Sequence, residues 1–343
     1  MSTWLDLRSY LPSASLSLQH VSGENGRQEP TEHGKTAKFS LRSVTRAYTL
    51  DWLLVVFLGL ALSLLNRSPG HKREFSLTDI SIQHSFAVHE RVPPWMLGVV
   101  STIIPLLVLV PIGVFISRNK WDLHNAVLGM SAISVALRIP EASFLGLFMS
   151  LSMAGIVTQL IKGSVGRPRP DLIARCLPNI GATDAYMYGL STVDICTNTN
   201  LLILDDGFKS FPSGHSSLSF AGLGFLSCFL AGKMHLYDKR GHRTRAWIAL
   251  VPCVGAMMVA ISRTEDNRHH WQDVLVGSLL GLFIAWLSYR TYFPPLSHRL
   301  CHLPLAPLES EEDSDLDRVA LLSDEENGAA PRDSEEAVAW RRG

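Results

Sequence analysis

Residues Lys209–Ser217, with the sequence Lys-Ser-Phe-Pro-Ser-Gly-His-Ser-Ser, stand at the start of an apolar run and organise the rest of the chain. Pro212 suits the first turn of a helix, and Gly214 lets the backbone come close to a ligand. Ser213 and His215 add a hydroxyl and an imidazole. A helix start attracts phosphate through its unpaired N–H groups and its dipole. The stretch therefore predicts a phosphate-binding helix start, although the same residues also suit an ordinary turn.

Two further polar motifs flank this stretch. They are Lys162-x6-Arg169-Pro170 upstream and Ser262-Arg263-x5-His269-x3-Asp273 downstream. In this order, the three motifs together resemble the signature of the type 2 phosphatidic acid phosphatase superfamily. That superfamily includes membrane lipid phosphate phosphatases and soluble vanadium haloperoxidases. The resemblance covers residues 48–293, and the following Pro-Asp-Leu-Ile-Ala-Arg-Cys is similar to the fungal diacylglycerol pyrophosphate phosphatase branch.

Composition points to a membrane protein. The chain has 343 residues, 47% of them hydrophobic, and its formal net charge is zero, so nucleic acid is not an expected partner. Long apolar runs lie between two polar tails, which is typical of a polytopic protein in a lipid bilayer. No N-terminal signal peptide is expected, because the first apolar run begins near Leu50, and that run would act as a signal anchor.

The pattern predicts an all-α, six-helix membrane bundle, and the resemblance implies a core like that of the phosphatases and haloperoxidases. Residues 1–47 are expected to form a disordered cytoplasmic tail, 48–293 the membrane-embedded phosphatase domain, and 294–343 an acidic, disordered cytoplasmic tail. Clear apolar runs cover residues 48–65, 95–116, 216–231, 246–261 and 274–287. Tyr289, Tyr292 and Phe293 are expected to form an aromatic belt at the membrane edge.

The third span is harder to define. Residues 121–161 are about twice a normal span in length, and Arg138, Pro140 and Glu141 lie in the middle. A charge at mid-bilayer would cost about 3 kcal/mol on insertion scales. We therefore predict that residues 130–146 are an insertion, such as a retained intron, and that 121–129 and 147–161 form one span. If the segment belongs to the functional protein, it should bulge out as a loop or a re-entrant piece.

Six spans place both tails in the cytoplasm and all three motifs on the opposite, lumenal face. Cys176 and Cys196 lie in the loop between the first and second motifs. In an oxidising lumen they would form a disulfide that contributes on the order of 3 kcal/mol, and the alternative is two free thiols. The cysteine spacing does not suit a zinc site.

The residue types at the motifs suit phosphate chemistry. A phosphate monoester carries about two negative charges and three non-bridging oxygens. Cations come from Lys162, Arg169 and Arg263, and neutral donors come from Ser213 and the backbone of Gly214. Metal ions and Mg²⁺ in particular are not required, because these cations can take their place, and the motifs offer no convincing carboxylate cluster. Glu265 and Asp266 are expected to form a solvated turn.

His269 and Asp273 are four residues apart, so they would share one face of a helix. The carboxylate would then orient the imidazole and stabilise its positive charge, leaving the other ring nitrogen to attack phosphorus. His215 would protonate the departing lipid oxygen as a general acid. The resemblance implies the same assignment, with a phosphohistidine at His269 that water hydrolyses.

The expected function is therefore a membrane phosphatase acting on phosphatidate, lysophosphatidate or diacylglycerol pyrophosphate. The alternatives are a sphingoid-base or isoprenoid phosphate phosphatase with the same site, and a catalytically inactive lipid-binding membrane protein. A haloperoxidase is disfavoured because that branch is soluble. An acidic dileucine pattern, Asp317 with Leu321 and Leu322, favours an endomembrane, and the vacuole in particular, through a sorting adaptor. A chance leucine pair is the competing interpretation.

Overall fold

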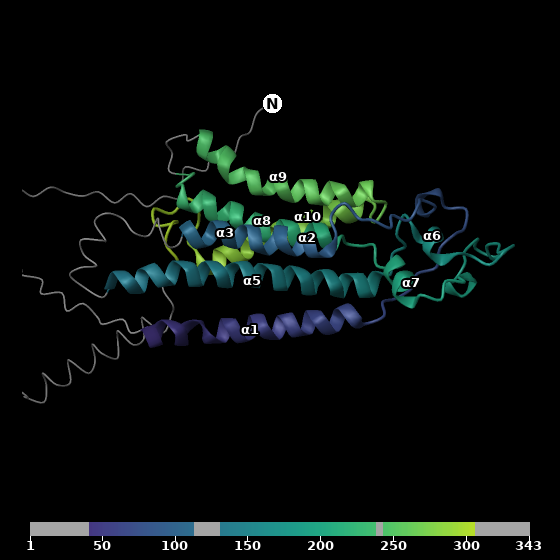
Figure 1. Ribbon diagram of the computed structural model, residues 1–343, viewed down its shortest axis with the longest axis horizontal. Coiled ribbons are helices and arrows are strands. Elements are labelled where there is room, and N and C mark those ends of the chain that lie inside the picture. Colours follow the sequence, from purple (N-terminus) through teal and green to yellow (C-terminus); the bar gives the residue numbers. More distant parts are fainter. Residues whose placement is uncertain (1–40, 113–130, 238–242, 306–343) are drawn as a thin grey trace, which may run out of the picture. The chain divides into compact units, whose positions relative to one another are not determined.

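The computed structural model describes residues 41–112, 131–237 and 243–305, and this part of the chain is helical (Figure 1). Its only β-type pairings are two isolated bridges, Phe75 with Ser191 and Pro178 with Cys196. Residues 121–129 and the pattern at Asp317, Leu321 and Leu322 lie outside the described residues. The long helices are α1 (Leu41–Arg67), α5 (Ser131–Val165), α8 (Gly214–Lys233), α9 (Arg243–Glu265) and α10 (Trp271–Tyr292).

Six segments of the described chain are long and apolar enough to cross a membrane, which confirms the predicted six-helix architecture. Five of them belong to the long helices. The sixth, Pro94–Pro111, is built from α2 (Pro94–Gly98), the π-helical η3 (Val99–Ile103) and α3 (Ile104–Pro111). Large apolar side chains of α1, α9 and α10 point outward, such as Leu64, Trp247 and Leu279, as expected for surfaces in contact with lipid.

The third span differs from the sequence expectation. It is one helical segment, Glu141–Val165, within α5, so residues 131–146 are helical and form no loop or re-entrant piece. Ala142 and Leu145 are fully buried in the core of the bundle. The 25 residues Glu141–Val165 are by themselves long enough to cross the apolar core of a bilayer. The retained-intron hypothesis itself stays a prediction.

Helix α8 is the central helix and packs against α5, α9 and α10. Small residues permit this close packing. A side chain at Gly281 of α10 would overlap the backbone carbonyl of Ser217, and one at Gly222 of α8 would overlap that of Ser101. The first contact brings α8 against α10, and the second brings α8 against η3.

The other ends of α8 and α10 form an aromatic core. Tyr289 and Phe293 stack with ring centroids 5.1 Å apart, and Phe229 meets Phe293 edge to face at 5.8 Å. Tyr289, Tyr292 and Phe293 are buried, so the predicted aromatic belt is wrong: these rings face the bundle and not the membrane interface. The segment after Phe293 also contacts the bundle, because Leu305 donates a backbone hydrogen bond to the Tyr292 carbonyl.

A polar cap covers the end of the bundle where α8 begins. It contains η2 (Ile80–Ile82), α6 (Leu172–Cys176), η5 (Val193–Ile195) and α7 (Leu201–Gly207), and Figure 1 shows α6 and α7 beyond the ends of the long helices. Phe75, Leu172 and Phe208 form its small apolar core. The disulfide expected between Cys176 and Cys196 is formed and closes the cap.

Candidate active site

The site is built around the first turn of α8. The Ser213 hydroxyl caps the helix by accepting from the Ser216 N–H at 3.4 Å, and the backbone N–H of Ser213 donates to the Asp273 carbonyl at 2.9 Å. The helix start leaves the N–H groups of Gly214 and His215 available for a ligand. A side chain at position 214 would begin 3.7 Å from Nζ of Lys162, so the glycine keeps room beside this cation.

His269 lies directly before α10 and is 96% buried. Its Nδ1 lies 2.7 Å from the backbone carbonyl oxygen of Ser210, so Nδ1 carries the proton and donates it to this oxygen. Its Nε2 makes no hydrogen bond to any residue that the structure describes. The ring therefore presents an unshared lone pair in a fixed orientation.

The expected hydrogen bond between His269 and Asp273 is not formed. The Nδ1 atom and the nearest carboxylate oxygen are 4.0 Å apart, because α10 begins only at Trp271 and the two residues do not share a helix face. Asp273 instead accepts from the Ser210 hydroxyl at 2.5 Å and from Arg167 at 2.6 Å. Ser210 thus connects the two residues, with its hydroxyl on Asp273 and its carbonyl on the imidazole.

The surroundings of His269 keep its ring neutral. Burial lowers the pKa of this imidazole well below its ordinary value, and the nearby positive charges of Arg169 and Lys162 lower it further. A neutral imidazole retains the lone pair that a nucleophile needs.

The three candidate phosphate-binding cations are almost completely buried. Lys162, near the end of α5, donates to the Lys209 carbonyl at 3.1 Å. Arg169 pairs with Asp206 at 2.7 Å. Arg263, in the last turn of α9, pairs with Glu90 at 2.8 Å and with Asp266 at 2.9 Å. Each cation is thus held by the protein's own acceptors.

The carboxylates that hold these arginines were not found from the sequence. Asp206, at the end of α7, also pairs with Arg175 at 2.9 Å. Burial would raise the pKa of Asp206, but the charges of Arg169, Arg175 and Lys162 outweigh it and lower the pKa to about 2. Since these groups are far apart in the chain, no motif spacing marks them.

The turn after α9 is partly buried, which corrects the expectation of a solvated turn. Asp266 is 95% buried and bound to Arg263, whereas Glu265 is exposed and pairs with Arg91. Arg268 was also missed. It pairs with Glu90 at 2.8 Å and lies 3.6 Å from Asp206, so it links the carboxylates on both sides of the site.

His215 lies in the first turn of α8, and its Nε2 is 3.1 Å from the Val92 carbonyl oxygen. Lys162, Arg169 and Arg263 are all within electrostatic range of its ring. The structure therefore brings together every site residue that the three motifs predicted. A cavity of about 510 Å³ opens beside Lys162, between the ends of α1 and α5 and helix α7.

Among the described residues, no three His, Cys, Asp or Glu side chains are arranged to hold a metal ion. The arrangement can instead bind an oxyanion with several negative charges through cations and backbone N–H groups. It holds a neutral imidazole beside that anion and has a second imidazole within the same cluster. These are the groups needed to transfer a charged group to a ring nitrogen and release it again.

Known proteins with similar sequences are lipid phosphatases by name. Residues 143–295, which contain all three motifs, match the PAP2 superfamily. The chain is 38% identical over 240 residues to the probable diacylglycerol pyrophosphate phosphatase 1 of Schizosaccharomyces pombe, covering 70% of this chain and 79% of that protein. It is 36% identical over 257 residues to lipid phosphate phosphatase 2 of Arabidopsis thaliana, with 74% and 80% covered.

Diacylglycerol pyrophosphate phosphatase 1 of Saccharomyces cerevisiae is 34% identical over 278 residues, which cover 80% of this chain and 89% of that protein. No solved structure matches the chain. The similarity to these relatives therefore extends over most of the membrane domain and the cap, beyond the motifs alone.

Proposed function

The chain belongs to the PAP2 superfamily and is a phosphatase, and we propose that it removes phosphate from lipid substrates through a covalent intermediate on His269. One observation carries this proposal: the buried His269 ring is held at Nδ1 by Ser210, while its Nε2 has no partner among the described residues. The charges of Lys162 and Arg169 lie beside this ring. That combination suits a nucleophile next to a bound phosphate.

In the first step, Nε2 of His269 attacks phosphorus and the bond from phosphorus to the lipid oxygen breaks. His215 gives a proton to the departing oxygen. In the second step, water gives a proton to His215 and attacks the phosphohistidine, which releases inorganic phosphate and the neutral imidazole. Lys162, Arg169 and Arg263 stabilise the charge on the non-bridging oxygens, with the N–H of Gly214 as an additional donor.

Asp273 acts indirectly in this scheme. When the imidazole bonds to phosphorus, the ring becomes positively charged, and the Ser210 carbonyl accepts the Nδ1 proton more strongly. Because the Ser210 hydroxyl donates to Asp273 at 2.5 Å, the carboxylate holds this residue in position. Asp273 is thus a positioning residue.

The catalytic groups lie at the membrane edge, which suits a substrate whose acyl chains stay in the bilayer. The cavity beside Lys162 contains residues from the end of α1, and this gives a lipid head group access from the membrane side. We propose phosphatidate, lysophosphatidate and diacylglycerol pyrophosphate as substrates, in line with the names of the relatives. Sphingoid-base and isoprenoid phosphates share the same phosphate chemistry and are the second candidates.

We propose that the site faces a lumen. The disulfide Cys176–Cys196 in the cap is expected on an oxidising side of the membrane. Lys233, Arg243 and Arg245 lie at the opposite ends of the helices, as the positive-inside tendency requires of the cytoplasmic face. An endomembrane, and the vacuole in particular, remains the proposed location through a sorting adaptor at Asp317, Leu321 and Leu322.

The decisive experiment is to trap the intermediate. Purified protein in detergent micelles is mixed with phosphatidate labelled at phosphorus and quenched within one turnover. We expect acid-labile label on His269, and no label in His269→Ala. A label found on another residue would reject the mechanism. The same experiment with excess chelator should give the same labelling, and loss of labelling would reject the metal-independent scheme.

A second comparison tests His215. p-Nitrophenyl phosphate has a leaving group that departs without a proton, whereas a lipid alkoxide needs one. His215→Ala should therefore slow labelling by phosphatidate far more than labelling by p-nitrophenyl phosphate. Equal effects on both substrates would reject the role as general acid. A panel of diacylglycerol pyrophosphate, phosphatidate and sphingoid phosphates then ranks the substrates.

A further inference from the structure

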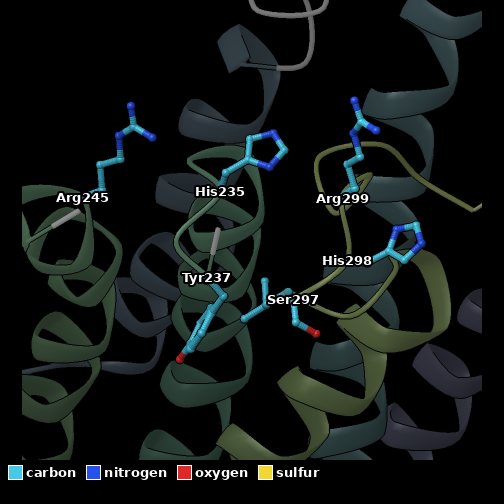
Figure 2. A pocket seen from close by; sticks show the side chains of 7 residues that line it. His235, Tyr237, Arg245, Ser297, His298 and Arg299 are labelled. Carbon is cyan, nitrogen blue, oxygen red and sulfur yellow. The ribbon is translucent and has the colours of Figure 1, made fainter. Parts of the chain in front are cut away.

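A second cavity, of about 450 Å³, lies at the ends of α8, α9 and α10 opposite to the candidate active site (Figure 2). Its walls come from the turn after α8, the first residues of α9 and the segment after α10. The polar side chains that line it are His235, Tyr237, Arg245, Ser297, His298 and Arg299. The motifs at the other end of the helices contribute nothing to this cavity.

The described residues that line it include two arginines and two histidines, and none of them is a carboxylate. Arg245 donates one hydrogen bond to the described residues, to the Met234 carbonyl at 3.0 Å. Arg299 makes no ion pair or side-chain hydrogen bond with any described residue. In Figure 2 the guanidinium groups of Arg245 and Arg299 lie on either side of the His235 imidazole and extend in the same direction. Such a set of cations, without an acidic partner in the part of the chain that the structure describes, favours an anionic ligand.

Contacts with the helix bundle hold the part of the cavity wall that contains His235 and the segment after α10. His235 lies 3.5 Å from the buried Cys301 sulfur, and its ring packs on His302 with centroids 4.6 Å apart. Lys233 donates to the His302 carbonyl at 2.5 Å, and Tyr289 donates to the Cys301 carbonyl at 3.3 Å. The segment after α10 is therefore attached to α8, and the spacing of the basic groups is set by the fold.

The cavity lies where the helices leave the apolar part of the membrane. Helix α8 ends at Lys233, α10 ends at Tyr292, and α9 begins at Arg243. Only two residues beyond Arg245, the side chain of Trp247 is 71% exposed on the outer face of α9. Basic groups beside such an apolar surface stand at the level of lipid head groups, and basic pockets between membrane helices bind anionic head groups.

We propose that this cavity binds a phosphate group, that of an anionic membrane lipid or of a soluble phosphate compound, through Arg245, Arg299 and His235. The ligand would bridge α9 and the segment after α10. This binding site is separate from the hydrolytic site, and the proposal stands whether or not the proposed catalytic mechanism is correct.

The test uses the full-length protein in lipid nanodiscs. One set contains phosphatidylcholine alone, and the other also contains phosphatidylglycerol, a phosphodiester that a monoester phosphatase does not consume. Native mass spectrometry measures the retained phosphatidylglycerol, and thermal unfolding measures stabilisation. We expect Arg245→Gln and Arg299→Gln each to weaken retention about tenfold, the loss of one charge-assisted hydrogen bond. Arg299→Lys should weaken it less, and hydrolysis should be unchanged in all variants.

Arg243→Gln is the matched control, because Arg243 is an exposed arginine two residues from Arg245 that does not line the cavity. Equal weakening by this control would show general attraction to surface charge and overturn the proposal. The proposal would also be overturned if no phosphatidylglycerol is retained and inorganic phosphate does not stabilise the protein.

A third arm separates the sources of the phosphate group. Stabilisation by inorganic phosphate in phosphatidylcholine, lost in Arg299→Gln, would support the site and assign it to a soluble compound. An Arg299-dependent stability that needs neither phosphate nor phosphatidylglycerol would point to the acidic residues at the end of this chain as the occupant. That result would overturn the proposal.

Discussion

The two ends of helix α8 are both rich in cations, but the cations are held differently. At the first turn, Arg169 and Arg263 are more than 90% buried, and each pairs with at least one carboxylate. At the last turn, Arg245 and Arg299 are exposed and have no carboxylate partner among the described residues. One end therefore offers an anion buried arginines that are paired with carboxylates, and the other offers exposed arginines.

The difference follows from the cost of burial. An isolated buried charge is unstable, so a buried arginine needs acids around it. Asp206 and Glu90 supply these acids and also fix the direction of each guanidinium. Fixed cations are suited to stabilising charge that develops during a reaction. The exposed arginines at the other end need no paired carboxylates, and their side chains can adjust to a bound head group.

The histidines differ in the same way. His269 is buried and its Nδ1 donates to a backbone carbonyl, which leaves Nε2 with its lone pair in a defined direction. His298 is exposed, and its Nδ1 accepts from the N–H of Leu300 at 3.1 Å. Only the arrangement at His269 suits a nucleophile. The first prediction therefore concerns the replacement of each histidine by alanine.

His269→Ala should lower kcat by at least roughly a thousandfold, because the covalent step loses its nucleophile. His298→Ala, at the other end of the bundle, should leave kcat within about twofold of the original value. Release of phosphate from phosphatidate in detergent micelles measures both. Substantial turnover in His269→Ala would show that the buried ring is not the nucleophile and would remove the main contrast between the two ends.

Replacing both Cys176 and Cys196 by Ser should destabilise the cap by on the order of 3 kcal/mol, since the disulfide closes a loop of about 20 residues. Thermal unfolding in micelles measures the change. Cys253→Ser is the control, because Cys253 is a free thiol on α9. If both variants unfold at the same temperature, the disulfide does not stabilise the cap, and the pairing of Asp206 with the arginines does not depend on it.

Asp206→Asn should lower kcat/KM for phosphatidate about tenfold, because Arg169 and Arg175 lose their shared acceptor. Asp206→Glu should restore part of the activity, and KM should change more than kcat if the arginines mainly bind phosphate. Asp205→Asn is the matched control, because Asp205 is the neighbouring carboxylate on α7 and pairs with Lys72 at 2.7 Å instead of with an arginine of the site. An equal loss in the control would argue for a general effect on α7.

The smallest predicted effect concerns pH. The folded-state pKa of Asp206 is about 2, below the unfolded value of about 3.9, so the unfolded chain binds more protons between these values. The stability that this carboxylate contributes is complete above about pH 4 and is lost as the pH falls towards 2. The difference in unfolding temperature between the original protein and Asp206→Asn should therefore persist at pH 4.5 and shrink near pH 2.5.

At the opposite end, the difference caused by Arg299→Gln should not change over this acidic range, because no described residue that lines that cavity is a carboxylate. The same unfolding measurements provide the comparison. A pH-dependent difference at Arg299 would indicate an acidic partner there and would weaken the contrast between the two ends.

Several parts of the fold could be predicted because they depend on local pattern. Apolar runs of about 20 residues predict membrane helices whatever their neighbours are. Two such helices separate the loop of the first two motifs from the loop of the third, so all three motifs lie on one face of the membrane. The motif residues between Lys162 and Asp273 are then expected to gather there. The length of α5 could not be predicted in this way, since the burial of Ala142 and Leu145 depends on the helices packed around them.

The sequence by itself determined the six-helix architecture, the family and the set of groups gathered around His269, because all of these follow from residue type and spacing along the chain. Only the tertiary structure decided how these groups are held. In the structure, Nδ1–H of His269 donates a hydrogen bond to the Ser210 carbonyl, and Asp273 accepts from Ser210 and Arg167. Glu90 and Asp206 pair with the arginines of the site. These partners come from separate elements, so contacts across the cap, and not spacing, determine them.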